Sequence, residues 1–217
     1  MKKNKAGIIC IAIGAALILA ALLLLLHNMA EDDLAGKTAI NKLSELQDEI
    51  SERENQLEPT IHVNPYDEDE VAESKEMTVA EIDGYGYIGY LSIPVLKLKL
   101  PVMSEWSYPQ LKIAPCRQFG STKSDDLVIA GHNYRTHFGH LSSLRVDDLV
   151  QFTDMDGTVS YYVVGEVNTI PPDSTDEVEH SQWALVLYTC TPGGKNRVMV
   201  GCQRITEDEL EQLADMK

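Results

Sequence analysis

Basic residues are scarce in this sequence. Its 217 residues include 18 lysines and arginines against 34 acids, which gives a net charge of −16. Such a surface repels phosphate, so we expect no nucleic-acid partner. Aromatic residues make up only 6% of the chain, and those that lie within apolar runs fall after residue 83. We therefore expect a folded core only in the last part of the chain. The aromatic residues in question are Tyr85, Tyr87, Tyr161, Tyr162 and Trp183.

Long apolar runs are also absent, with one exception between Ala6 and Leu26. About 20 apolar residues in a helix span the hydrocarbon layer of a membrane. Three lysines precede the run and three acids follow it, an order that favours a cytoplasmic N-terminus. We predict that residues 1–30 form a cytoplasmic tip and a single-pass anchor, with residues 6–26 in lipid and the rest of the chain outside. A cleaved signal peptide is the alternative, although its apolar region is usually only about 7–15 residues long.

The next segment is strongly acidic, because residues 31–83 carry 17 acids against 4 bases. Leu43, Ile50 and Leu57 recur every seven residues, which predicts a helical spacer over residues 31–57. Three such repeats are marginal for a coiled coil, and a solvated helix is the simpler interpretation. Residues 58–80 contain too few apolar side chains to fold, so we predict a flexible acidic linker there.

Residues 81–217 read as a mainly β domain. Short apolar runs alternate with turn residues, and short connections between many strands favour a closed or nearly closed barrel. We expect short helices at residues 108–115 and after Arg204, where Thr206 and Glu209 have capping-box spacing. The predicted strands cover residues 86–93, 96–102, 126–132, 148–153, 158–167, 183–189 and 197–205.

Three residues at predicted strand ends have the chemistry of a nucleophilic site. Cys190 ends one strand, and the turn that follows returns Arg197 at the start of the next. A guanidinium donates to a carbonyl oxygen or oxyanion, and its charge favours the thiolate. His132 comes after the buried run of residues 127–130 and Gly131, and histidine is the residue type that exchanges protons near neutral pH. Together they supply a nucleophile, a proton donor and an anion stabiliser.

Other interpretations of these residues remain open. An exported domain could instead be a non-catalytic surface module in which Cys190 is oxidised with Cys202. Cys202 has the opposite parity to Arg197 on the same strand, so we interpret it as a small buried hydrophobic residue. We interpret Cys116 as structural. His132, His137 and His140 could belong to a metal site. The acidic connection with Asp173, Asp176, Glu177 and Glu179 could bind calcium, although a solvated loop is the simpler interpretation.

Residues 186–190, Val-Leu-Tyr-Thr-Cys, together with Arg197 and the "IAGH" that ends at His132, resemble the sortase family of Gram-positive transpeptidases. The family motif is Thr-Leu-x-Thr-Cys, so Val186 departs from it at the first position. The resemblance covers about residues 84–205 and includes "GYIGYLSIP" near its start. The connection from Ile170 to Trp183 is too short for the helix-bearing insertion of class B sortases, which favours an A- or D-like subclass. The turn from Cys190 to Arg197 is also shorter than in many sortases, and that turn helps to shape the substrate groove.

This resemblance implies an eight-stranded sortase-type β-barrel after the N-terminal transmembrane helix and helical stalk. It implies that Cys190 is the nucleophile, His132 the general acid and base, and Arg197 the substrate clamp. The expected partners are proteins with an LPxTG-like sorting signal and an amine acceptor from a peptidoglycan precursor or a pilin lysine. We expect no cofactor and no metal. Substrate-binding residues are expected beside the catalytic ones, at Thr189, Ala130 and Gly131.

Overall fold

The computed structural model of the chain describes residues 5–56, 76–174 and 178–215. It divides into two compact units, residues 1–34 and residues 35–217. Helix α1 (Lys5–Gln56) contributes to both. Its N-terminal part contains a stretch that is long and apolar enough to cross a membrane, by length and composition alone. A signal sequence near an N-terminus passes the same test.

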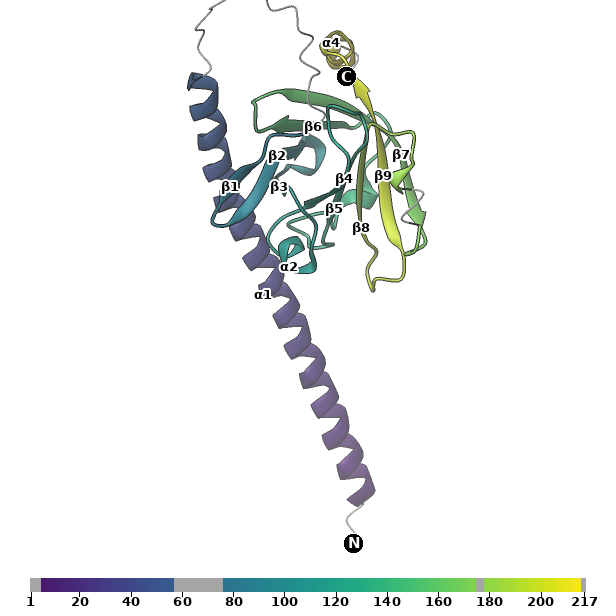
Figure 1. Ribbon diagram of the computed structural model, residues 1–217. Helices are drawn as coiled ribbons and strands as arrows, with labels where there is room; N and C mark the ends of the chain where they lie inside the picture. The colour runs from purple at the N-terminus through teal and green to yellow at the C-terminus, as the bar shows by residue number, and fades with distance from the viewer. Residues whose placement is uncertain (1–4, 57–75, 175–177, 216–217) are drawn as a thin grey trace, which may run out of the picture. The chain divides into compact units, whose positions relative to one another are not determined.

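A closed β-barrel dominates the second unit (Figure 1). Among the described residues, eight strands follow one another in the order β2-β3-β4-β5-β8-β9-β7-β6, and β6 pairs with β2 to close the ring. Strand β1 adds to the edge of β2. The predicted eight-stranded barrel is therefore confirmed. The strands are β1 (Ala80–Ile82), β2 (Tyr85–Ile93), β3 (Leu98–Met103), β4 (Cys116–Phe119), β5 (Leu127–Gly131), β6 (Leu149–Asp154), β7 (Val159–Ile170), β8 (Leu185–Cys190) and β9 (Arg197–Ile205).

The observed strands agree with the predicted ones wherever apolar residues alternate with polar residues or form a continuous run. Two short strands, β1 and β4, were not predicted. The run at residues 96–102 begins later than expected, because residues Pro94–Leu96 form a 3-10 helix and Lys97 adopts a left-handed conformation with φ 51°. Helix α2 (Tyr108–Leu111) is shorter than predicted, and helix α4 (Glu207–Asp215) begins after Thr206. Thr206 N donates to Glu209 Oε2 and Glu209 N donates to Thr206 Oγ1, and these two hydrogen bonds form the predicted capping box.

Alternate side chains of the barrel strands belong to two different environments. Ile129 of β5, Leu187 of β8 and Val200 of β9 lie in the interior cluster. Their neighbours Ala130, Tyr188 and Met199 lie in clusters on the outer face. This alternation fixes which side chains near the strand ends face inward and which face outward.

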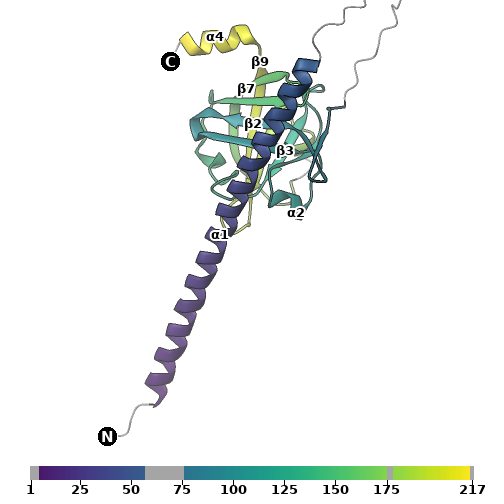
Figure 2. The same ribbon diagram turned by 90° about the vertical axis from the view of Figure 1, so that its left-hand side faces the viewer.

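The C-terminal part of α1 packs on the outer face of the barrel (Figure 2). Leu46 and Ile50 are buried in a cluster with Tyr87 of β2 and Met103 of β3. Lys42 forms an ion pair with Asp83, between β1 and β2. The expectation of a fully solvated spacer over residues 31–57 is therefore wrong for this face of the helix. Its apolar residues cover outer-face side chains that would otherwise meet water.

The folded domain also begins earlier than residue 81. Most of the predicted linker, residues 58–80, lies outside the described residues. Met77, however, is buried in the interior cluster, and Ala80 begins β1. Residues 77–80 thus belong to the barrel domain, because the side chains of Met77 and Ala80 are buried in it.

Leu46→Ala tests whether α1 stabilises the barrel. Leu46 is 0% exposed, and we expect its truncation to lower the free energy of unfolding by about 2–5 kcal/mol. Ile40 lies on the same helix and is 64% exposed, so Ile40→Ala should change the free energy of unfolding by less than about 0.5 kcal/mol. Urea unfolding of the full chain in mild detergent, followed by tryptophan fluorescence, measures both. Equal stability of the two variants would show that the helix adds nothing to the barrel.

Candidate active site

The turn between β8 and β9 sets Cys190 beside Arg197. The two residues are direct register partners at the end of the antiparallel pair. Between them, Thr191 N donates to Asn196 O at 2.9 Å and Gly194 N donates to Thr191 O at 2.7 Å. Gly193 and Gly194 have φ of 83° and 72°, which favours glycine at both positions. The sequence Thr-Pro-Gly-Gly therefore builds the turn that returns the arginine to the thiol.

His132 reaches the same end of the barrel through a different pairing. Strand β5 runs parallel to β8, with Gly131 opposite Thr189, so His132, the residue directly after β5, is level with Cys190. Gly131 is required here because a Cβ atom would lie 2.5 Å from Cδ2 of the buried Phe138. The imidazole of His132 stacks on Tyr134, with ring centroids 4.7 Å apart.

Strand parity puts all three side chains on the outer face of the barrel. Cys190 shares the parity of Tyr188, Arg197 that of Met199, and His132 that of Ala130, which all lie in outer clusters. The three residues line one cavity of about 240 Å³. Its walls also include Leu111, Ile170, Val178 and Tyr188, which make the cavity largely apolar. The turn from β8 to β9 and helix α2 lie at the same end of the barrel (Figure 1).

The guanidinium of Arg197 is held by the turn itself. Its Nη1 donates to Gly194 O at 3.2 Å and to Asn196 O at 3.1 Å. Within the described part of the chain, Nε and Nη2 donate to no protein acceptor. The group is therefore positioned by backbone carbonyls and retains donors for a carbonyl oxygen in the cavity.

The other two cysteines of the barrel are buried. Cys202 lies in the interior cluster with Val198 and Val200, as its parity predicts. Cys116 packs in the outer cluster, and its Sγ lies 3.5 Å from Ala114 O. Burial raises the pKa of each thiol to about 12, so both stay protonated at neutral pH. All four cysteines are free thiols, and Cys190 is half-buried. A disulfide between Cys190 and Cys202 does not form, because they lie on opposite faces of the barrel.

The three histidines near β5 do not gather into one site. His137 is buried, His132 is half-buried and His140 is exposed. Within residues 5–56, 76–174 and 178–215, no group of three or more potential ligands is arranged to hold a metal ion. Of the acids considered for calcium, Asp176 and Glu177 lie outside the described residues.

The substrate-binding residues predicted from the sequence, Ala130, Gly131 and Thr189, also line the cavity. Thr189 is buried, and its Oγ1 accepts or donates no hydrogen bond within the described residues. Three aromatic side chains that were not predicted also line the cavity, namely Trp106, Tyr108 and Tyr188. Burial raises the pKa of the Tyr188 phenol to about 12, so it stays neutral. Trp106 and Tyr108 form an edge-to-face pair with ring centroids 5.0 Å apart.

Comparisons with known proteins agree on one family. The family model described as Sortase domain matches residues 91–205. Sortase A of Bacillus anthracis is 29% identical over 121 residues, which cover 53% of this chain and 57% of that protein. The match thus spans little more than half the length of this curated relative.

Solved structures show the same fold. The sortase D5 transpeptidase of Clostridium perfringens superposes with a TM-score of 0.57 at 17% identity, over 78% of this chain and 99% of that chain. Sortase C1 of Streptococcus agalactiae superposes with a TM-score of 0.50 at 27% identity, over 58% of this chain and 72% of that chain. Because the family model covers about half of the chain and the barrel is shared, this chain belongs to the sortase family.

Proposed function

We propose that this protein is a membrane-anchored cysteine transpeptidase that cleaves an LPxTG-like sorting signal and transfers the acyl group to an amine. One observation carries the proposal: Cys190 and Arg197 are register partners, and His132 follows the residue that pairs with Thr189. A hairpin of two consecutive strands and a strand that lies about 50 residues earlier thus bring a nucleophile, an acid and base, and a fixed cation to one cavity. Membership of the sortase family supports the same chemistry.

In the first half of the proposed reaction, the thiolate of Cys190 attacks the carbonyl carbon of the threonine in the sorting signal. The C–S bond forms, and negative charge develops on the carbonyl oxygen. Arg197 donates to this oxygen through the N–H groups that the turn leaves available. His132 protonates the nitrogen of the departing glycine as the C–N bond breaks, and a thioacyl-enzyme remains.

In the second half, an amine attacks the thioester, the C–S bond breaks and the Cys190 thiolate is restored. His132, now neutral, takes the proton that the attacking nitrogen loses. The acceptor amine belongs to a cell-wall precursor or a pilin lysine. Water is a slower competitor, and its attack yields hydrolysis. The apolar walls of the cavity keep water away from the thioester.

We also propose that residues 6–26 anchor the protein in the cell membrane, with the N-terminus in the cytoplasm and the barrel outside. The length and composition of this part of α1 support a membrane span. Protease added to intact cells should therefore release a fragment that contains the barrel. Protection of the barrel, with cleavage only after the cells are lysed, would exclude this topology.

Replacement of Cys190 should abolish acyl transfer. Cys190→Ala removes the nucleophile, and Cys190→Ser replaces it with a hydroxyl that stays protonated near neutral pH. Both variants should keep the barrel fold, because the side chain is only half-buried. Cys202→Ala and Cys116→Ala should retain transfer, since their thiols lie elsewhere in the core. Product formation from a sorting peptide and an amine, measured by chromatography, distinguishes them. Transfer by Cys190→Ala would refute the assignment.

Arg197→Lys tests the planar donor group of the arginine. Lysine keeps the positive charge but loses the paired N–H donors and the two bonds from Nη1 to the turn. We expect kcat/KM for acyl transfer to fall about 100-fold, as for loss of one donor to an oxyanion. Lys195→Ala, an exposed change in the same turn, is the matched control. Near-normal turnover of Arg197→Lys at normal thermal stability would mean that charge alone is sufficient.

A further inference from the structure

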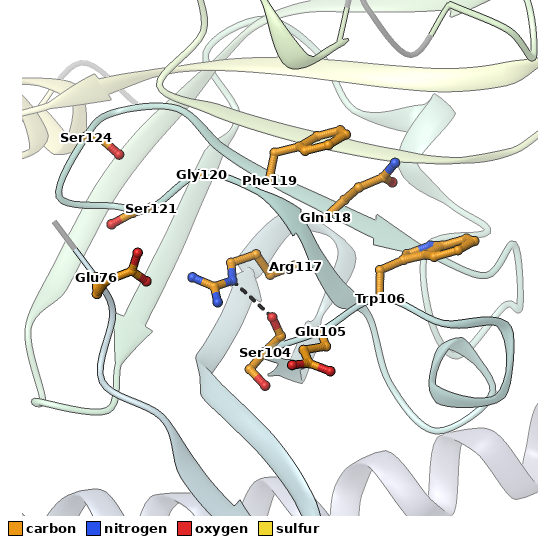
Figure 3. Close-up of a pocket in the computed structure, with 10 residues that line it drawn as sticks. All are labelled: Glu76, Ser104, Glu105, Trp106, Arg117, Gln118, Phe119, Gly120, Ser121 and Ser124. Atoms are coloured by element: carbon orange, nitrogen blue, oxygen red, sulfur yellow. Dashed lines mark hydrogen bonds between the residues drawn. The ribbon is translucent and has the colours of Figure 1, made fainter.

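A second cavity, of about 590 Å³, adjoins the one that contains Cys190. Trp106 and Gln118 line both cavities, so they form a common wall. The larger cavity is built by the loop after β3, by β4 and by the loop after β4. In Figure 3 the guanidinium of Arg117 points toward Glu76 at one end, while Trp106 and Gln118 lie at the other end. A molecule bound here would contact the same wall as a substrate on Cys190.

The polar groups of this larger cavity carry charges of both signs. Glu76 and Glu105 contribute carboxylates, and Arg117 contributes a guanidinium whose Nε donates to Ser104 O at 3.0 Å. The side chain of Gln118 also indicates a bound ligand. Its Oε1 atom is buried, and it receives no hydrogen bond from any donor among the described residues. A buried acceptor of this kind is stabilised when a ligand supplies an N–H donor.

We propose that the larger cavity binds the acceptor substrate, an amine whose molecule also carries a free carboxylate, as a lysine within a pilin chain does not. This inference rests on the proposed transpeptidation, which requires two substrates at one thioester. The sorting signal occupies the cavity of Cys190, so the attacking amine must approach from a neighbouring space. Gln118 and Glu105 attract its N–H groups, and Arg117 attracts its carboxylate.

The mixed charge makes this cavity selective. A simple diamine would place a second cation near Arg117, which repels it. An amino acid with an amine on its side chain and a free α-carboxylate can instead pair its ammonium with Glu105 and its carboxylate with Arg117. The acceptor arrives as an ammonium ion and releases one proton to water. The neutral nitrogen then attacks the thioester past Trp106. The C–N bond forms, the C–S bond to Cys190 breaks, and His132 takes the second proton.

The experiment measures how the thioacyl-enzyme divides between aminolysis and hydrolysis. The full chain in mild detergent receives one LPxTG-type peptide and, as acceptor, either Nα-acetyl-lysine or its carboxamide. We expect Nα-acetyl-lysine to have the lower KM, by about 5-fold, because only it carries the carboxylate. Glu105→Gln should lower the ratio of aminolysis to hydrolysis about 5-fold. Glu81→Gln makes the same charge change on the exposed side of β1 and lines neither cavity, so it should leave the ratio unchanged.

The possible results distinguish failure of the acceptor site from failure of the proposed transpeptidase activity. If the wild-type protein forms no thioacyl-enzyme and hydrolyses no peptide, the transpeptidase proposal fails, and the acceptor site fails with it. If both reactions proceed but Glu105→Gln matches Glu81→Gln, the larger cavity does not bind the acceptor. If Glu105→Gln instead raises KM for the sorting peptide alone, the cavity belongs to the donor substrate. Either of the last two results overturns the inference and leaves the transpeptidase intact.

Discussion

The register of β8 against β9 is the constraint on which the site depends. It makes Cys190 and Arg197 partners, and the turn between them closes through backbone bonds of Thr191 with Asn196 and Gly194. A slip of one residue would turn Cys190 into the barrel and Thr189 outward. The alternation of Leu185 and Leu187 into the interior prevents that slip, since it would expose both leucines. The hydrophobic core thus determines the direction in which the thiol points.

The parallel pairing of β5 with β8 adds the histidine to this arrangement. His132 and Cys190 are far apart in the sequence but lie close together, because β5 and β8 run parallel and end at the same edge of the sheet. Gly131 allows Phe138 to pack against that edge, which holds the chain as it leaves β5. The same barrel buries Cys116 and Cys202 and raises the pKa of both thiols to about 12. Burial therefore leaves Cys190 as the accessible thiol of the barrel.

The sequence predicted the features that depend on local pattern. Alternating and continuous apolar runs located most strands, and the glycines after Cys190 located the turn and its returning arginine. Strand β4 was missed because Cys116–Phe119 is four residues long and mixes polar with apolar side chains. The packing of α1 was missed because its buried positions Leu46 and Ile50 lie among many acids, and heptad spacing does not reveal what a helix contacts. Trp106 and Gln118 come together through tertiary structure alone.

If Cys190 is the nucleophile, the acyl group can be located on this residue of the wild-type chain by mass spectrometry. An LPxTG-type peptide is mixed with the full protein, the reaction is stopped with acid, and the tryptic fragments are weighed. Cys190 falls in residues 146–195, Cys116 in residues 113–117 and Cys202 in residues 198–204, so the fragments separate the three thiols. We expect an acyl adduct on residues 146–195 that hydroxylamine removes. An adduct on another fragment, or none while product accumulates, would contradict it.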